Sequence, residues 1–191
     1  LAERCAGGSA EISLIVKRVA AGMEQHQDSF SDLEEIGIGS QFREELCRML
    51  ESTQLFRGFS RAEIEFFVDY THAYRAPVGV TLFREGSKDK YLAFIVKGKV
   101  KILKEFGFSK EKHIATARPG SCLGEISIVD DFPHSATAKV VEQAEVIILT
   151  KRNLLRITEE SAALGIQILW RLAWQLSARL RKTSGALAEH L

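Results

Sequence analysis

The chain has 191 residues, of which 46% are hydrophobic and 27% charged, a composition typical of a folded globular protein. Lys and Arg number 26 against 25 for Asp and Glu, so the formal net charge is +1. Proteins that bind nucleic acid usually carry a clear basic excess, so we expect no DNA partner. The sequence also lacks an apolar run of the roughly 20 residues that cross a bilayer, so we expect no membrane partner.

Three cysteines, Cys5, Cys47 and Cys122, form an odd set without a CxxC pair. This pattern argues against a disulfide framework or a structural zinc site and is typical of a reducing compartment. Residues 1–10 lack the apolar core of a secretory signal. We therefore expect a cytoplasmic protein without a metal or a cofactor.

Helical patterns come first along the chain. Apolar residues three and four positions apart predict one amphipathic helix over residues 10–25 and a second over residues 42–50. Ser60 followed by Glu63 is a capping box, which predicts the start of a third helix. We assign residues 1–51 to an N-terminal helical extension.

Short β-rich segments alternate with glycines from about Tyr74 to Thr150. Such a series is typical of a sandwich or a barrel, because glycine supplies the positive φ that tight corners need. We expect an α+β protein: a β-roll or jelly-roll barrel of about eight antiparallel strands over residues 74–150, with N-terminal helices and a long C-terminal helix. The predicted strands include Val80–Arg84, Tyr91–Val96, Lys99–Lys104, His113–Ala117, Thr137–Val141 and Val146–Thr150.

Helical periodicity returns after Lys151. An apolar stripe from Leu164 to Leu180, with Trp170 and Trp174 beside it, predicts a long helix at about 158–185. This helix completes a second domain of residues 52–191. Because the stripe has more apolar surface than one barrel can cover, we expect a homodimer.

Several segments occur in an order that points to a known family. They are Leu55–Ser60 (LFRGFS), Ala76–Gly86 (APVGVTLFREG), Leu92–Val100 (LAFIVKGKV) and Pro119–Glu125 (PGSCLGE). Together they resemble the cyclic-nucleotide-binding domain family, of the type found in catabolite activator proteins and protein kinase A regulatory subunits. The chain ends at Leu191, so we expect no DNA-binding domain after the long helix.

The resemblance implies a binding cassette at Gly124, Glu125, Ile126 and Ser127. In the family, a glycine at the position of Gly124 lets the backbone approach the ligand closely. Glu125 corresponds to the carboxylate that accepts a hydrogen bond from the ribose 2′-hydroxyl. A buried carboxylate of this kind is selective, because a ligand without the hydroxyl leaves it unpaired.

The phosphate contacts implied by the resemblance fall on His134, Ser135 and Ala136. The family normally has arginine where this chain has His134. Arginine pairs with phosphate through a planar, permanently charged fork, whereas histidine has a shorter reach and a reference pKa of about 6.5. Two alternatives follow: His134 contacts the phosphate, or it is a partly exposed histidine in a pocket that has lost its ligand.

A last matching segment, Ala178–Ser184 (ARLRKTS), places Thr183 and Ser184 where the family reads adenine with hydroxyls. The expected ligand is a cyclic nucleotide, cyclic AMP before cyclic GMP, and we expect no catalysis. We hypothesise a regulatory sensor that couples ligand binding to movement of the C-terminal helix, with a protein effector as a further partner. The alternative is a scaffold of the same fold that binds no nucleotide and acts in protein–protein interaction.

Overall fold

The computed structural model describes residues 30, 32–36, 40–51, 53–107 and 110–188 of the chain. The chain divides into two compact units, residues 1–31 and residues 32–191, and the described helices and strands all belong to the second. The helix predicted over residues 10–25 lies outside the described residues.

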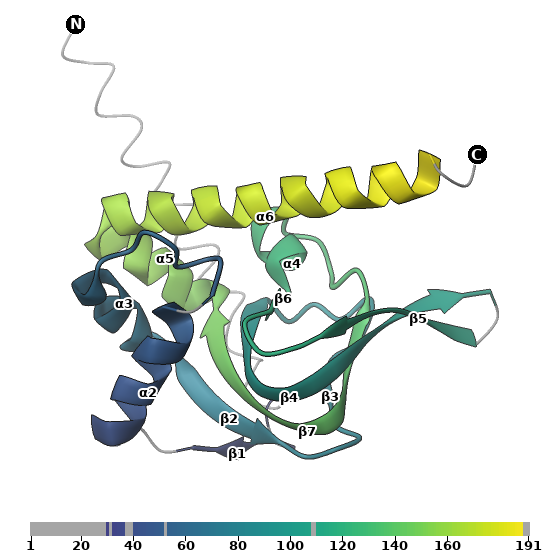
Figure 1. Cartoon of the computed structure of the whole chain (residues 1–191), viewed down its shortest axis with the longest axis horizontal. Coiled ribbons are helices and arrows are strands. Elements are labelled where there is room, and N and C mark those ends of the chain that lie inside the picture. Colours follow the sequence, from purple (N-terminus) through teal and green to yellow (C-terminus); the bar gives the residue numbers. More distant parts are fainter. Residues whose placement is uncertain (1–29, 31, 37–39, 52, 108–109, 189–191) are drawn as a thin grey trace, which may run out of the picture. The chain divides into compact units, whose positions relative to one another are not determined.

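The second unit contains an antiparallel sheet that curls into a roll (Figure 1). Seven strands form it among the described residues, in the order β1-β2-β7-β4-β5, with β3 also pairing with β7 and β6 with β4. This arrangement confirms the predicted α+β fold with an antiparallel β-roll. The strands are β1 (Glu34–Glu35), β2 (His72–Ala76), β3 (Thr81–Phe83), β4 (Tyr91–Phe106), β5 (Lys110–Ala117), β6 (Cys122–Leu123) and β7 (Thr137–Thr150).

Two pairs of predicted strands are each one continuous strand in the structure. One pair is Thr137–Val141 and Val146–Thr150, which form β7. Tyr91–Val96 and Lys99–Lys104 merge into β4, because Gly98 marks a register shift against β7 and not a turn. Gly98 has φ 80°, and a Cβ there would overlap the carbonyl oxygen of Gln143 on β7. Glycine at this position therefore permits a close approach of two backbones within the sheet.

The core lies between the sheet and the helices that cover it. Leu46 and Leu50 of α2 (Ser40–Glu51) and Phe67 of α3 (Arg61–Val68) are buried in it together with apolar side chains of β4 and β7. Three phenylalanines meet there: the ring of Phe56 lies 4.6 Å from that of Phe67 and 5.9 Å from that of Phe94, centroid to centroid. One continuous core thus joins α2 and α3 to the barrel.

The helix α3 begins at the predicted capping box. The Ser60 side chain accepts a hydrogen bond from the backbone N–H of Glu63, whose carboxylate accepts one from the backbone N–H of Ser60 at 2.6 Å. Each bond satisfies an N–H group that has no partner within a helix.

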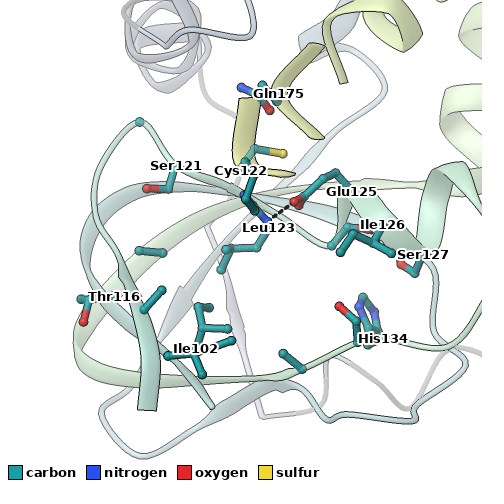
Figure 2. A pocket seen from close by; sticks show the side chains of 18 of the residues that line it. Ile102, Thr116, Ser121, Cys122, Leu123, Glu125, Ile126, Ser127, His134 and Gln175 are labelled. Carbon is teal, nitrogen blue, oxygen red and sulfur yellow. Dashed lines mark hydrogen bonds and ion pairs between the residues drawn. The ribbon is translucent and has the colours of Figure 1, made fainter. Parts of the chain in front are cut away.

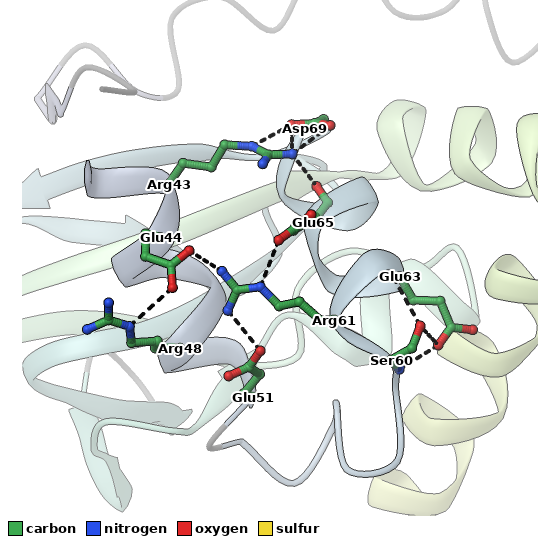
Figure 3. Close-up of polar contacts among 9 residues, drawn as sticks. All are labelled: Arg43, Glu44, Arg48, Glu51, Ser60, Arg61, Glu63, Glu65 and Asp69. Atoms are coloured by element: carbon green, nitrogen blue, oxygen red, sulfur yellow. Dashed lines mark hydrogen bonds and ion pairs between the residues drawn. The ribbon is translucent and has the colours of Figure 1, made fainter. Parts of the chain in front are cut away.

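Charged side chains fix α2 against α3 (Figure 3). The guanidinium of Arg61 on α3 contacts both Glu44 and Glu51 of α2, the second at 2.9 Å. Arg43 of α2 in turn donates to the carboxylate of Asp69 at 2.9 and 3.0 Å, just after α3. Single exposed ion pairs add little to stability, but this network holds the two helices in one relative position.

Two helices follow the barrel where the sequence indicates one at about 158–185. They are α5 (Lys151–Glu160) and α6 (Ala162–Ala188), separated at Ser161, whose backbone leaves the helical region with φ −143° and ψ 86°. Gly165 lies so close to Thr158 that a Cβ would overlap it, so the two helices pack tightly.

The long helix α6 crosses the end of the roll, above the short helix α4 (Glu125–Val129) (Figure 1). Leu164, Ile168 and Leu172 of its first half are buried in the core, whereas Trp170 and Leu180 are 76% and 67% exposed. The predicted apolar stripe is therefore only partly covered in a single copy of the chain. Among the described residues, no helix is long and apolar enough to cross a membrane.

Candidate functional site

A pocket of about 650 Å³ lies between α6 and the end of the roll. It brings together seven of the nine residues that the sequence singled out, and Figure 2 shows Glu125 and His134 on one side of it with Thr116 on the other. The long helix closes the pocket with Trp174, Gln175, Ala178 and Arg179. The predicted residues that line it are Gly124, Glu125, Ile126, Ser127, His134, Ser135 and Ala136.

Gly124 forms the turn between β6 and α4. Its φ of 85° lies in the left-handed region, and a Cβ there would overlap the carbonyl oxygen of Tyr91 and lie 3.3 Å from Cε1 of His134. The position thus requires glycine twice over, for its backbone angle and for the space. The hydroxyl of Ser127 donates to the carbonyl oxygen of Gly124 at 2.9 Å and closes the turn.

Glu125 is 2% exposed at the first position of α4. Its Oε1 forms an ion pair with the guanidinium of Arg179, whose side chain is 53% exposed on α6. Burial raises the pKa of Glu125, and the charge of Arg179 and its hydrogen bond oppose that rise. The carboxylate thus links the cassette to the long helix.

Arg179 is a pocket residue that the sequence reasoning missed. It belongs to the ARLRKTS segment, from which only Thr183 and Ser184 were predicted as site residues. Helical spacing alone does not reveal which of Arg179 and Arg181 faces the cassette; only the docking of α6 on the roll does. Arg181 instead bonds within α6, where it donates to the Ser177 hydroxyl at 2.8 Å.

His134 is also 2% exposed, so the interpretation of a partly exposed histidine is wrong. Its ring stacks on Phe83 with 4.0 Å between centroids and 8° between planes, and it meets the ring of Tyr91 edge-on at 5.7 Å. The loop before β4 also holds its backbone: the His134 N–H donates to the carbonyl of Ser87 at 2.9 Å, and the N–H of Gly86 donates to the His134 carbonyl at 2.9 Å.

The two ring nitrogens of His134 differ. Nε2 is buried and has no hydrogen-bond partner. Burial lowers the pKa of His134, while the charge of Asp89 and a hydrogen bond to the backbone of Asp89 act to raise it. The ring therefore presents one unsatisfied polar atom, a rare feature in a folded protein and one that calls for a partner.

Ser135 and Ala136 lie where the chain leaves this loop and enters β7. The Ser135 side chain is exposed, and its carbonyl accepts a hydrogen bond from Nζ of Lys104 at 2.8 Å. Lys104 also pairs with Glu85. An ammonium group thus lies at Ser135, although it comes from β4 and no sequence motif indicated it.

Thr183 and Ser184 do not line the pocket. Both are exposed on the last turns of α6, and the Thr183 hydroxyl donates to the carbonyl of Arg179, one turn earlier, at 2.9 Å. Within one copy of the chain, the expected adenine-reading hydroxyls are therefore separate from the other predicted site residues.

The chemistry of the pocket suits a polar organic molecule. One carboxylate, one imidazole and one guanidinium face a space whose other walls include Ile102 and Leu123. A few convergent polar groups on apolar walls are typical of small-molecule sites. Within the described residues, no group of three or more metal-ligating side chains occurs.

Comparison with known proteins finds a family whose model matches part of the chain. The model of the cyclic nucleotide-binding domain matches residues 75–161, from β2 through α5. Domains of this family are regulatory and not catalytic, the class of function that the sequence predicts for this chain.

Relatives with known names or structures cover a larger part of the chain. The cyclic AMP receptor protein of Thermus thermophilus is 26% identical over 133 residues, 70% of this chain and 60% of that protein. The regulator CRP of Escherichia coli, named as cAMP-activated, is 29% identical over 63% of this chain and 56% of its own length. A cyclic nucleotide-binding domain structure from Methylobacillus flagellatus is 27% identical with a TM-score of 0.76, over 87% of this chain and 93% of that one. The chain thus spans well under two thirds of these two curated relatives.

Proposed function

We propose that the chain is a ligand-sensing regulatory module whose pocket under α6 binds a cyclic nucleotide. The match of residues 75–161 to the model of the cyclic nucleotide-binding domain supports this proposal. The observation that carries the proposal is the pocket itself, because it gathers the predicted cassette around the buried Glu125. Cyclic AMP is the first candidate, since the Thermus and Escherichia relatives are named for it.

In this proposal, Glu125 accepts a hydrogen bond from the ribose 2′-hydroxyl, and the cyclic phosphate lies towards His134, Ser135 and Ala136. The buried carboxylate already has Arg179 as a partner, so a ribose hydroxyl joins an existing ion pair. Burial of the carboxylate makes the site selective for a ligand with this hydroxyl, because an analogue without it leaves carboxylate lone pairs unsatisfied.

The regulatory output of the proposal is a change in α6. Four residues of this helix line the pocket, and its Arg179 pairs with Glu125 of α4. A ligand that binds better when α6 is docked shifts the population towards the docked state, by as much as its affinities for the two states differ. Whatever contacts the exposed end of α6 then senses the ligand, and a protein effector is one such partner.

A homodimer through α6 is part of the proposal. The helix leaves several large apolar side chains exposed, among them Trp170 at 76% and Leu180 at 67%. Light scattering at micromolar concentration should give a dimeric mass for the wild type and a monomeric mass for a Trp170→Ser, Leu180→Ser double variant. Val78→Ser is the control, because Val78 is 64% exposed but lies before β3 and not on α6. A monomeric wild type would contradict the dimer.

We also propose a cytoplasmic location. This proposal is supported by the two cysteines among the described residues, Cys47 and Cys122, which are both buried free thiols. Such residues are inert packing groups in a reducing compartment.

Calorimetric titration with cyclic AMP and cyclic GMP tests the ligand. Glu125→Ala should weaken binding by roughly 1.5–3 kcal/mol, the value of a hydrogen bond to a charged group, while the fold is retained. Glu142→Ala is the matched control, because Glu142 is an exposed carboxylate paired with Lys99 outside the pocket. Equal affinity of the two variants would place the ligand elsewhere.

A scaffold that binds no nucleotide is the second candidate. One observation favours it: His134 stands where the family has an arginine. Under this reading, neither nucleotide gives heat with the wild type or with His134→Arg, and the exposed face of α6 contacts another protein.

A further inference from the structure

His134 lines the pocket, and its unpaired ring nitrogen is an acceptor, not a donor, when the ring is neutral. The ring makes a hydrogen bond to the backbone of Asp89, and this bond favours the protonated ring, so the ring donates and a carbonyl accepts. Because Nε2 has no partner, the donating nitrogen is Nδ1. The bond holds the single proton of the neutral imidazole on Nδ1, and Nε2 is left with a lone pair.

The contacts of the ring oppose an exchange of the two nitrogens. It is stacked flat on Phe83 at 4.0 Å, the edge contact with Tyr91 closes a second side, and its Cε1 faces Gly124. A rotation that brought Nδ1 into the pocket would also break the bond to Asp89. The neutral ring is therefore expected to keep its lone pair on Nε2.

An anionic phosphate oxygen cannot bind to this lone pair. The phosphate of a cyclic nucleotide is a singly charged diester that carries no proton near neutral pH, so it offers only acceptors. Two facing acceptors repel each other, and the contact becomes favourable only when Nε2 carries a proton, which also makes the imidazolium a charged donor.

We propose that the pocket takes up a cyclic nucleotide together with one proton, which passes from the solvent to Nε2 of His134. The inference rests on the proposed function and adds a regulator to it, namely pH. The imidazolium then has both nitrogens as donors, Nδ1–H to Asp89 and Nε2–H to the phosphate. No bond other than the new N–H is formed.

The charged groups around His134 fit this role. From the loop before β4, the carboxylate of Asp89 favours the imidazolium. Phe83 of β3 is apolar, and the hydroxyl of Tyr91 of β4 donates to the carbonyl of Leu82. The remaining ionised groups in the pocket are Glu125 of α4 and Arg179 of α6, which neutralise each other as a pair. Burial lowers the pKa of the ring, so the neutral form predominates at pH 7.4 before the phosphate binds.

Titration calorimetry with cyclic AMP in two buffers of different ionisation enthalpy, PIPES and Tris, tests the proposal at pH 7.4. The difference in heat counts protons, and we expect an uptake that approaches one per nucleotide. Affinity should fall by close to tenfold per pH unit above the pKa of the free ring, and so by up to about 100-fold between pH 5.8 and 7.8, because only the protonated fraction binds. The variant His134→Arg should bind at both pH values with no proton uptake, because guanidinium stays charged.

Two further variants identify the group that takes the proton. His72→Gln removes an exposed histidine of β2 and should keep both the uptake and the pH dependence. His134→Gln keeps a neutral side chain and should bind weakly at every pH without uptake. Nucleotide binding to the wild type without uptake would overturn the proton coupling, as would an uptake that persists in His134→Arg.

This experiment distinguishes a failure of the proton coupling from a failure of the proposed function. If His134→Arg binds cyclic AMP and the wild type does not bind even at pH 5.8, the proton coupling is wrong while the pocket is shown to suit the nucleotide. If neither protein binds cyclic AMP or cyclic GMP at any pH, the proposed function itself is wrong, and the proton coupling with it.

Discussion

Two polar side chains in one pocket are equally buried but differ in whether they have a polar partner. Glu125 and His134 are each 2% exposed. Glu125 has a partner, because Arg179 reaches it from α6, whereas Nε2 of His134 has none. Under the proposed function, this difference separates two tasks: Glu125 links the pocket to α6, and His134 offers an unpaired nitrogen for a ligand.

The two ends meet at Gly124, and its substitution should have the largest effect. We expect Gly124→Ala to lower the free energy of unfolding by about 2–4 kcal/mol, since it adds backbone strain and a clash with Tyr91. Gly79→Ala is the matched control: its φ is 94°, yet nothing lies within 4 Å of the added Cβ. It should cost only about 1 kcal/mol in urea unfolding. Equal losses in the two variants would mean that backbone angle alone matters at Gly124.

The two groups should also give stability opposite pH slopes in the unliganded protein. The folded-state pKa of His134 is lowered, so below about 6.5 the unfolded chain binds more protons and stability rises with pH. The folded-state pKa of Glu125 is raised, so above about 4.3 the folded chain holds more protons and stability falls with pH. Each slope is at most about 1.4 kcal/mol per pH unit.

Urea unfolding of His134→Gln and Glu125→Gln between pH 4.5 and 7.5 measures these slopes. Relative to the wild type, His134→Gln should lose less stability on acidification, and Glu125→Gln should lose more. Parallel curves for all three proteins would show that neither group changes its pKa on folding.

Removal of the partner of Glu125 should have a smaller effect. Arg179→Gln leaves a buried carboxylate without its ion pair, but the guanidinium is half exposed and its contribution is screened by water. We expect a loss of about 1 kcal/mol in unfolding free energy. Arg181→Gln on the same helix, which loses only a bond to Ser177, should stay within about 0.5 kcal/mol of the wild type. A loss in the control as large as in Arg179→Gln would indicate a general effect on α6.

The smallest effect should come from Thr183 and Ser184. Both are exposed and outside the pocket, so their replacement by alanine should change stability by less than about 0.5 kcal/mol. If the proposed dimer forms, we expect their effect on cyclic AMP affinity to depend on it. A loss of affinity in the dimeric wild-type background that is absent in the Trp170→Ser, Leu180→Ser background would assign these hydroxyls to the pocket of the partner copy.

Local signals in the sequence predicted much of this molecule. The capping box at Ser60, the alternation of β-rich segments with glycines and the helical stripe after Lys151 each report a backbone preference that acts over a few residues. The glycine-separated segments predicted a turn at Gly98, but a glycine in a β-rich run marks either a turn or a bulge. Only the partner strand β7 decides that it is a bulge.

The binding cassette was predicted from Gly124 to Ala136, because the order of its residues along the chain is itself the signal. The partners of those residues were not. Arg179 and Lys104 reach the site from α6 and β4, at sequence separations of 54 residues from Glu125 and 31 from Ser135. No local pattern encodes such meetings, since they depend on how the helix docks and how the strands register.

By itself, the sequence determined which residue types stand in the cassette, including a histidine where the family has an arginine. Only the tertiary structure decided how buried that histidine is and which partners its ring has. Burial against Phe83 and Tyr91, the bond to Asp89 and the absence of a partner at Nε2 all come from segments that the fold brings together. The sequence determines the type of each side chain, but its surroundings in the fold set its charge and its tautomer.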